Sequence, residues 1–324
     1  MKAFVQDTYG PLDVLRLDDI DRPVVGDDDV LVRVHAAGVD PGVWHLMTGL
    51  PYLLRLTGFG LRAPKVRVRG MDVAGLVEEV GRNVTGFRPG EEVFGTCQGS
   101  FAEYACTPQT KLAPKPVNLD LTAAATVPTS ALTALQGLRD SGRVRSGQRV
   151  LIVGAAGGIG TYAVQLAKEF GAHVTGLCST GKLELVRALG ADEVIDYTRE
   201  DFTDGTHRYD LILDIAGHRS LNRLRRALSR TGTLVIVGSE TKGRWFGGVD
   251  RVLRALVLTP FIRHRLRGLV QVESAEDLRT LRTLIEAGKL TPVIDRTYTF
   301  DEIPQAIEYI HKGHARGKVA ITMV

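Results

Sequence analysis

Cysteine is scarce in this sequence of 324 residues, and the three that occur, Cys97, Cys106 and Cys178, form no CxxC pair. A disulfide-stapled protein needs several paired cysteines, so the sequence is not of that class. The scarcity is typical of a protein kept in a reducing compartment, and we expect a cytoplasmic location.

The sequence also lacks long polar tracts and long runs of one charge sign, so it does not have the composition of a disordered chain. Its formal net charge of +4 is small for this length, which suits anionic ligands without requiring nucleic acid. No apolar core of a signal peptide follows the opening MKAFVQD. Residues 150–167 carry no charge over the length of a membrane span, but turn glycines such as Gly154 and Gly157 interrupt them. We therefore expect a buried strand and helix there and no integral membrane segment.

The length and the 44% of apolar residues predict a globular protein of two domains. In the first third, alternating apolar residues predict strands at 30–35 and 72–80, separated by turns. A helix capped by Thr122 is expected to run through Ala125, and a further helix is expected over Ser130–Leu138.

From Arg149 onward, strand-like and helix-like segments alternate, which predicts βαβ units and a parallel sheet. Strands are expected at 150–153, 173–177, 193–195, 211–215 and 234–237, with helices at 161–170, 183–189 and 220–228. The segments 297–300 and 319–322 again have the pattern of strands, and we expect them to return to the first domain.

The stretch VLIVGAAGGIG, Val150–Gly160, predicts a strand that leads through a glycine-rich turn into a helix. A side chain at Gly157 would stand between the backbone and a bound pyrophosphate, and Gly160 lets the helix pack closely on the strand. Free N–H groups at the helix start then meet the diphosphate. Because the strand, the helix and further βαβ-like cycles are all present, we predict a dinucleotide site rather than an ordinary tight turn.

The end of the second strand in this cycle distinguishes NADPH from NADH. An NAD site carries an acid about 20 residues past the glycines, whereas this chain has Ser179, Thr180 and Lys182 there. Hydroxyls and an ammonium suit a 2′-phosphate, so NADPH is the expected cofactor. The alternative is that Ser179 caps the next helix and Lys182 lies on its solvated face. Tyr197, after the third strand, is expected beside the adenosine.

Beside AAGGIG at 155–160, the chain carries EEVFG at 91–95, FAEYA at 101–105, LTALQGL at 132–138, LVRALGADEVIDYTREDF at 185–202 and GHARGKVAI at 313–321. Together these segments resemble the medium-chain dehydrogenase/reductase superfamily, and within it the zinc-independent quinone oxidoreductase branch. The resemblance covers nearly the whole chain. It implies an α/β protein with a GroES-like β-rich catalytic domain at 1–122, completed by 298–324, and a Rossmann domain with a doubly wound parallel sheet at 123–297. NADPH is expected between the two.

The resemblance also implies roles for single residues. Those expected to hold the cofactor are Ala156, Gly157, Gly158, Ile159, Gly160, Ser179, Thr180, Lys182, Tyr197, Ala216 and Gly238, with Arg316 and Lys318 on a looser match. Thr133 and the Gly238 backbone fall near the nicotinamide. The candidate catalytic residues are Asp40, Tyr52 and Thr133.

Zinc-containing members of the superfamily use a Cys, the His of a Gly-His-Glu run, and a second Cys. Here Asp40 stands at the first Cys position, Gly70-Met71-Asp72 replaces Gly-His-Glu, and Val127-Pro128-Thr129 offers no second Cys. The four close cysteines of the structural zinc lobe are absent from the sequence too. Methionine is a poor zinc ligand, so no metal is expected. Asp40, Asp72 and His45 are the alternative ligand set, but hydrogen bonding and fold support suit them better.

Without zinc, a simple carbonyl is hard to polarise. A conjugated acceptor spreads the incoming charge, so hydride transfer to it requires mainly positioning and a few donors. The expected activity is therefore hydride transfer from NADPH to a quinone or α,β-unsaturated carbonyl. An enoyl-thioester reductase or a zinc-free alcohol dehydrogenase-like enzyme is the alternative. Water, the ribose 2′-hydroxyl or Tyr52 is the expected proton donor, although Tyr52 could simply pack within 50–56.

Asp40 is a departure from the branch, which usually has Asn at this position and an Asp where this chain has Val43. An ionised Asp only accepts hydrogen bonds and opposes the negative charge that hydride transfer builds on the substrate oxygen. Asp40 could be a neutral acid with a raised pKa, or accept a hydrogen bond from the substrate, or be structural.

Two basic clusters remain, one of Arg62, Lys65, Arg67 and Arg69 and one of Arg251, Arg254, Arg263, Arg265 and Arg267. The second suits a solvated helix at a subunit edge, and its alternatives are a substrate entrance, an acidic partner or a membrane surface. A non-catalytic NADPH sensor or a nucleic-acid-binding protein would be a different class. The sequence has no RNA-module signature, so we expect a small-molecule substrate, a homodimer and no nucleic acid.

Overall fold

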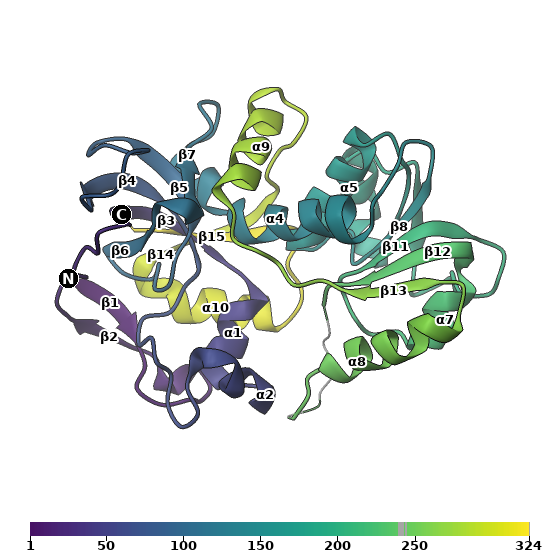
Figure 1. The fold of residues 1–324 in the computed structure, drawn as a ribbon, viewed down its shortest axis with the longest axis horizontal. Coiled ribbons are helices and arrows are strands. Elements are labelled where there is room, and N and C mark those ends of the chain that lie inside the picture. Colours follow the sequence, from purple (N-terminus) through teal and green to yellow (C-terminus); the bar gives the residue numbers. More distant parts are fainter. Residues whose placement is uncertain (239–242, 244, 324) are drawn as a thin grey trace. The chain divides into compact units, whose positions relative to one another are not determined.

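The computed structural model describes residues 1–238, 243 and 245–323, and the chain forms two compact units (Figure 1). Unit 1 comprises residues 1–132 and the chain from 272 onward, and unit 2 comprises residues 133–271. Residues 123–132 and 272–297 therefore belong with the β-rich unit, whereas the sequence-based boundaries put them in the Rossmann domain. Two contacts between residues far apart in the sequence explain why 272–297 belongs to unit 1. Lys111 Nζ lies 2.5 Å from Glu273 Oε2, and the Asn118 amide donates to the Ile285 carbonyl.

Unit 1 is built around a seven-stranded sheet in the order β14-β15-β3-β4-β5-β7, with β6 paired to β3, and a separate β1-β2 ribbon. Its strands are β1 (Lys2–Val5), β2 (Arg16–Asp19), β3 (Asp29–Val39), β4 (Asp72–Val80), β5 (Glu92–Thr96), β6 (Tyr104–Pro108), β7 (Leu112–Pro114), β14 (Ile294–Thr299) and β15 (Lys318–Thr322). Its helices are α1 (Pro41–Thr48), α2 (Tyr52–Leu54), α3 (Leu121–Ala125), α9 (Ala275–Glu286) and α10 (Ile303–His311). Helix α4 (Pro128–Gln136) runs across the boundary between the units.

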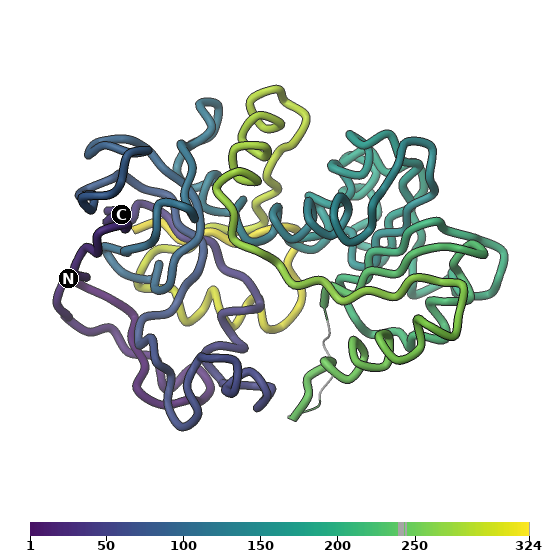
Figure 2. The backbone as a smooth tube through the Cα atoms, in the orientation of Figure 1, coloured from purple at the N-terminus to yellow at the C-terminus, as the bar shows by residue number. Residues whose placement is uncertain are grey.

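The last strand returns to the first third of the chain, as expected. Strand β15 pairs antiparallel with β3, with Val319 opposite Val39, and Figure 2 shows this yellow segment among the purple and blue ones. Apolar side chains from both ends of the chain share one core, in which Val39, Met47, Ile307 and Ile321 are each at most 1% exposed. Burial of these side chains is what holds the N- and C-terminal segments in a single unit.

Unit 2 has a six-stranded, all-parallel sheet in the order β10-β9-β8-β11-β12-β13. The strands are β8 (Arg149–Val153), β9 (His173–Cys178), β10 (Glu193–Asp196), β11 (Tyr209–Asp214), β12 (Leu228–Ile236) and β13 (Arg265–Gly268). The helices are α5 (Gly158–Glu169), α6 (Leu183–Ala188), α7 (Leu221–Arg226) and α8 (Val249–Leu258), with α5 on one side of the sheet and α7 and α8 on the other (Figure 1). This is the doubly wound order of a Rossmann domain, whose direction reverses between β8 and β11.

Two local expectations were wrong. The cap of α3 is Asp120, whose side chain accepts a hydrogen bond from the Ala123 N–H at 2.7 Å, and Thr122 lies inside the helix. Arg251 is not on a solvated face, because it is 6% exposed and its guanidinium contacts the buried Asp214 carboxylate at 2.6 Å. No helix among the described residues combines the length and apolar character that crossing a membrane would need.

Replacing Arg251 with Ala should destabilise unit 2 strongly. The Arg251 guanidinium also donates to the Gly217 and Arg219 carbonyls, and burial already raises the pKa of Asp214. The variant leaves that carboxylate buried without its cation, and such a loss costs about 3–5 kcal/mol. Urea unfolding would measure the change in the free energy of unfolding.

Arg254→Ala is the matched control, because Arg254 is on the same helix with a side chain 73% exposed, 3.4 Å from Asp250. A surface pair of this kind contributes about 0–1 kcal/mol. If both variants lose the same small amount of stability, the Arg251 pair does not hold α8 to the sheet.

Candidate active site

Apart from Arg316 and Lys318, which belong to unit 1, the residues predicted to hold the cofactor lie at one edge of the unit 2 sheet. Because all six strands are parallel, the segments that follow β8, β9, β10, β11 and β12 emerge at the same edge. These segments contain Ala156–Gly160 after β8, Ser179, Thr180 and Lys182 after β9, Tyr197 after β10, Ala216 after β11 and Gly238 after β12. Open parallel sheets bind ligands at this edge, where the strand order reverses.

The start of α5 is open where a phosphate would lie. Gly157 is the N-cap, and no side chain caps the helix, so the N–H groups of the first turn are not satisfied by a capping residue. A Cβ on Gly157 would meet only the Gly154 oxygen, at 3.5 Å, whereas a Cβ on Gly160 would lie 2.1 Å from that oxygen. Gly160 therefore permits the close approach of helix and strand, and the helix start fits a dinucleotide diphosphate.

The residues after β9 differ in their hydrogen-bond partners. Ser179 precedes a short helical turn, but its side chain makes no capping hydrogen bond, which removes the capping alternative for its hydroxyl. The Thr180 hydroxyl donates to Asp196, an acid 4% exposed whose pKa is lowered by hydrogen bonds from Thr180 and Thr198. Arg199 Nε lies 3.6 Å from Asp196, and its side chain is 73% exposed. Sequence reasoning missed both Asp196 and Arg199.

Three strands of unit 1 bring a second group of polar residues together. Asp40 follows β3, Asp72 begins β4 and Lys318 begins β15. The strands are neighbours, with Gly38 opposite Asp72 on one side and Ala320 on the other. Their adjacent ends therefore place two carboxyl groups and one ammonium at the same point.

The Lys318 ammonium is the centre of this group. Its Nζ lies 2.5 Å from Asp40 Oδ1, 3.1 Å from Ser130 Oγ and 3.4 Å from Asp72 Oδ2. Ser130 donates to Asp40 at 3.0 Å, and Thr129 donates to Asp72 through its N–H and its hydroxyl. The Lys318 side chain is 1% exposed. The sequence assigned Lys318 to the cofactor, but its ammonium is engaged inside the buried Asp40–Asp72–Lys318 cluster.

The charges of the cluster balance if one proton is shared by the two carboxyl groups. Burial tends to raise the pKa of Asp40, but the Lys318 charge and hydrogen bonds to Asp72, Lys318 and Ser130 outweigh it and lower that pKa. Burial and then the Asp40 charge raise the pKa of Asp72 to about 8. A proton on Asp72 also gives a donor to Asp40 Oδ2, which is buried and otherwise lacks a partner in the described part of the chain.

This result bears on the three roles considered for Asp40. A neutral Asp40 with a raised pKa is disfavoured, because the Lys318 ammonium 2.5 Å away lowers the pKa of Asp40, whereas burial raises that of Asp72. Burial lowers the pKa of Lys318 less than the two carboxylates raise it, so its pKa is raised overall. At neutral pH the cluster then holds one carboxylate, one carboxylic acid and one ammonium.

The cluster does not fit a zinc ion. Lys318 already supplies the cation that Asp40 and Asp72 contact, at the positions where zinc-containing relatives carry a Cys and the Glu of Gly-His-Glu. Met71 occupies the place of the His, and a thioether is a poor zinc ligand. Among the described residues, no three His, Cys, Asp or Glu side chains are grouped to hold a metal.

The remaining predicted residues lie in different surroundings. Tyr52 begins α2, and the Arg55 guanidinium lies 4.8 Å from its ring centroid. Arg316 is exposed, and its N–H donates to Asp295. Thr133, in α4, is 6% exposed and belongs to unit 2. Tyr197 is 47% exposed, so its ring is accessible.

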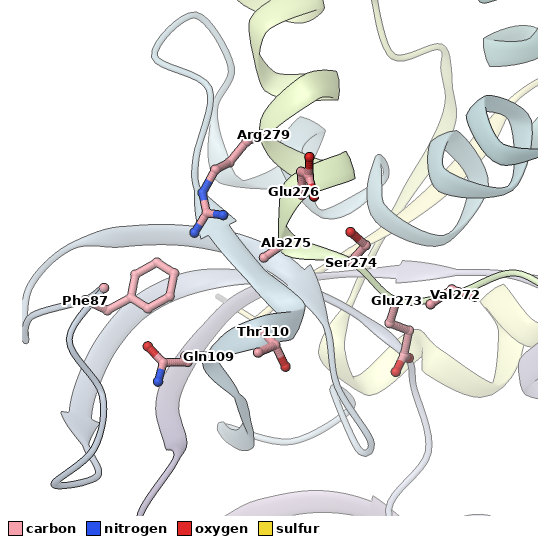
Figure 3. A pocket seen from close by; sticks show the side chains of 10 residues that line it. Phe87, Gln109, Thr110, Val272, Glu273, Ser274, Ala275, Glu276 and Arg279 are labelled. Carbon is pink, nitrogen blue, oxygen red and sulfur yellow. The ribbon is translucent and has the colours of Figure 1, made fainter. Parts of the chain in front are cut away.

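Two of the cavities formed by the described residues lie within unit 1. One of about 450 Å³ lies beside the start of α9, where Glu273, Glu276 and Arg279 share its wall with Phe87 (Figure 3). It contains no predicted site residue. The other, of about 230 Å³, contains Met71, and we call it the Met71 cavity. Its wall includes Tyr9, Val43, Leu46, Phe59 and Arg69.

Comparison with known families matches two parts of the chain. Residues 26–117 match the alcohol dehydrogenase GroES-like domain, and residues 189–321 match a family described as zinc-binding dehydrogenase. The first match lies in unit 1, and the second begins in unit 2 and ends in unit 1.

Whole-length relatives agree with these matches. The chain is 34% identical, over 100% of its length and 89% of the relative, to the NAD(P)H oxidoreductase RTN4IP1, mitochondrial, of Mus musculus. It is 33% identical, over 99% of its length and 79% of the relative, to the NADPH-dependent alkenal/one oxidoreductase, chloroplastic, of Arabidopsis thaliana. The solved quinone oxidoreductase of Coxiella burnetii is 30% identical, with a TM-score of 0.85 over 100% of this chain and 99% of that one.

Asp72→Asn should weaken the pH dependence of stability. The folded-state pKa of Asp72, about 8, lies above the ordinary value of 3.8, so the folded state holds an extra proton between those values. Unfolding free energy therefore falls as pH rises through this window, by at most about 1.4 kcal/mol per pH unit. We expect the parent protein to lose stability between about pH 4 and about pH 8, and the variant to lose less.

Trp44 lies in unit 1, so its fluorescence in a Trp245→Phe background would report thermal unfolding of that unit. Glu79→Gln, an exposed carboxylate on the same strand β4, is the control and should follow the parent. If the stability of Asp72→Asn falls with rising pH as much as that of the parent, the proton is not on Asp72.

Proposed function

Because the chain belongs to the medium-chain dehydrogenase/reductase superfamily, in its quinone oxidoreductase-like branch, we propose that it reduces a quinone or an α,β-unsaturated carbonyl with NADPH. One observation carries the choice of acceptor. The buried Asp40–Asp72–Lys318 cluster contains the two residues at the sequence positions where zinc-containing members of the superfamily carry a Cys and the Glu of Gly-His-Glu, and its charges balance without a metal. A conjugated acceptor suits such a site, because it spreads the incoming charge over several atoms.

The names of the relatives support this proposal. The relatives of this chain include an NAD(P)H oxidoreductase, an NADPH-dependent alkenal/one oxidoreductase and a quinone oxidoreductase. When bound, NADPH supplies the hydride. The start of α5 fits its diphosphate, and the segments after β9 and β12 fit its adenosine and nicotinamide sides, respectively.

Residues of this chain then have distinct tasks. Ser179 and Lys182 are proposed to bind the 2′-phosphate, with Arg199 as a further cation nearby, and Thr180 is engaged with Asp196. Asp40, ionised and bonded to Lys318, serves as an acceptor and fold-supporting group and not as the acid. Tyr52, water or the ribose 2′-hydroxyl is left to deliver the proton, and Thr133 is proposed to lie beside the nicotinamide.

NADPH consumption, followed with a panel of quinones, enones and enoyl thioesters, tests the function directly. Turnover of quinones or enones is the expected result. Turnover of enoyl thioesters alone would replace the proposal by the thioester reductase alternative. Binding of NADPH with no turnover in the whole panel would favour a non-catalytic sensor.

We also propose a homodimer in the cytoplasm. Strand β13 is the edge of the unit 2 sheet, and Val270 beside it is 84% exposed, so an open edge is present for a second copy. The three cysteines are free, which suits a reducing compartment. Light scattering of the purified protein would give its oligomeric state.

Lys182→Ala should raise the KM for NADPH about tenfold and leave the KM for NADH nearly unchanged, because one charge-assisted hydrogen bond contributes about 1.5–3 kcal/mol. Steady-state kinetics with both cofactors would measure it. Lys168→Ala is the matched control, since that ammonium is bonded to Asp192, 2.7 Å away. Equal effects of Lys182→Ala on both cofactors would remove Lys182 from the phosphate site.

Activity should not depend on zinc. Elemental analysis of the purified protein should find less than stoichiometric zinc, and a chelator should leave kcat unchanged, because Lys318 already supplies the cation that Asp40 and Asp72 contact. Loss of activity on chelation, with recovery on adding zinc, would refute the metal-free site.

A further inference from the structure

Arg69 is a buried cation whose side chain makes no hydrogen bond or ion pair with the described part of the chain. It is 5% exposed, and its Nε is buried without a hydrogen-bond partner. No hydrogen bond or ion pair of its side chain occurs with any residue that the structure describes. The other cations of the same basic cluster differ, since Arg67 is bonded to Asp7 at 2.6 Å and Arg62 and Lys65 are exposed.

The backbone around Arg69 is held on both sides. The Arg69 N–H donates to the Phe4 carbonyl, and its own carbonyl accepts from the Phe101 N–H at 2.9 Å. Gly70 follows with φ of 97°, and a Cβ there would lie 2.3 Å from Ser100 Oγ. The Met71 carbonyl then accepts from the Cys97 N–H at 2.8 Å. Arg69 and Met71 are thus fixed one residue apart on either side of a turn that only glycine fits.

The charge on Arg69 has no counterion among the residues that the structure describes. Burial lowers its pKa to about 10, so the guanidinium stays protonated at neutral pH. Tyr9 is the group whose charge interacts with it, and burial raises the pKa of Tyr9, which keeps this phenol neutral. A buried cation with no partner costs free energy that packing alone does not return. A ligand that brings a negative charge would recover it.

Arg69 lies in the wall of the Met71 cavity, and the composition of that wall suits an anion. Lys65 is also part of it, and none of the described residues that line it is Asp or Glu. The cavity beside α9 is different, because Glu273 and Glu276 line it as well as Arg279 (Figure 3). At about 230 Å³, the Met71 cavity is smaller than the roughly 300–1,000 Å³ of drug-sized sites, so it fits a small molecule.

We propose that Arg69 binds a carboxylate carried by the substrate, so that the physiological acceptor is a small conjugated carbonyl compound with an acid group. This inference rests on the proposed function for the reaction itself. The planar guanidinium matches a carboxylate with two parallel hydrogen bonds. Met71, at the sequence position of the family's His, lines the same cavity, so a compound whose acid group is bound by Arg69 lies in the space that Met71 also lines.

The test compares two substrates that differ in one charge. Acetylacrylate is an enone that carries a carboxylate, and its methyl ester is neutral. In each, the hydride of NADPH adds to the alkene carbon β to the ketone and a proton adds to the α carbon, which gives the saturated ketone and NADP⁺. We expect kcat/KM for the acid to exceed that for the ester by about tenfold or more, the value of one charge-assisted contact.

Arg69→Met should abolish this preference by lowering kcat/KM for the acid while leaving the ester unchanged. Arg69→Lys, which keeps the charge and loses the two-bond geometry, should retain part of the preference. Arg67→Met is the matched control and should keep the whole preference, because Arg67 is bonded to Asp7. The thermal midpoint of Arg69→Met should not fall, since the side chain has no partner to lose within the described chain.

Equal kcat/KM values for acid and ester in the parent protein, or an equal loss for both in Arg69→Met, would overturn the inference. If neither compound is reduced, the proposed function fails for this class, and binding decides the inference separately. Levulinate, the saturated keto acid, should raise the thermal midpoint of the parent and not of Arg69→Met, while methyl levulinate should raise neither. No shift with levulinate would show that Arg69 binds no carboxylate.

Discussion

One buried ammonium sets the arrangement of the β-rich unit. Lys318 joins Asp40 across 278 residues of sequence and lies between the ends of β3, β4 and β15. Because an unpaired charge inside a protein is costly, these strands are stable together only if the two carboxyl groups and the ammonium are all present. The same bond determines the chemistry, since it leaves Asp40 and Asp72 satisfied without a metal and leaves Asp40 as an acceptor.

Unit 1 contains a second buried cation, Arg69, whose side chain lacks the partners that Lys318 has. Lys318 is bonded to two carboxyl groups and a hydroxyl, whereas Arg69 has no partner in the described chain. The contrast matters because both are at most 5% exposed. A cation that the fold needs is neutralised by the fold, as Lys318 and the Arg251–Asp214 pair illustrate. A buried cation left without a counterion is better explained by a ligand than by stability.

The sequence predicts those features of the fold that depend on local patterns of apolar residues, such as strand bounds and the type of sheet. Strand β4 has the expected bounds, Asp72–Val80, and the alternation after Arg149 gives the parallel sheet, because side-chain periodicity reflects burial on a sheet or helix face. Partners far apart in sequence leave no such pattern. The Lys318 contacts with Asp40 and Asp72, the Arg251 contact with Asp214 and the Lys111–Glu273 bond that ties the 272–297 segment to unit 1 all join residues far apart in the sequence. Asp120 and Thr122 are both good caps, and only the geometry selects Asp120.

The two halves of the candidate site have complementary electrostatics for the proposed reaction. The Asp40–Asp72–Lys318 cluster is neutral overall, so it neither attracts nor repels a charged substrate strongly. The Met71 cavity, with Arg69 and Lys65, attracts negative charge. Hydride transfer adds one negative charge to a conjugated carbonyl, and a substrate carboxylate already carries another. Arg69 offsets the charge of the acid group through a charge-assisted contact, so the bound acid meets the incoming hydride with no more net charge than its neutral ester. The cation therefore acts on the acid group and not on the developing enolate, and reduction of the ester does not depend on it.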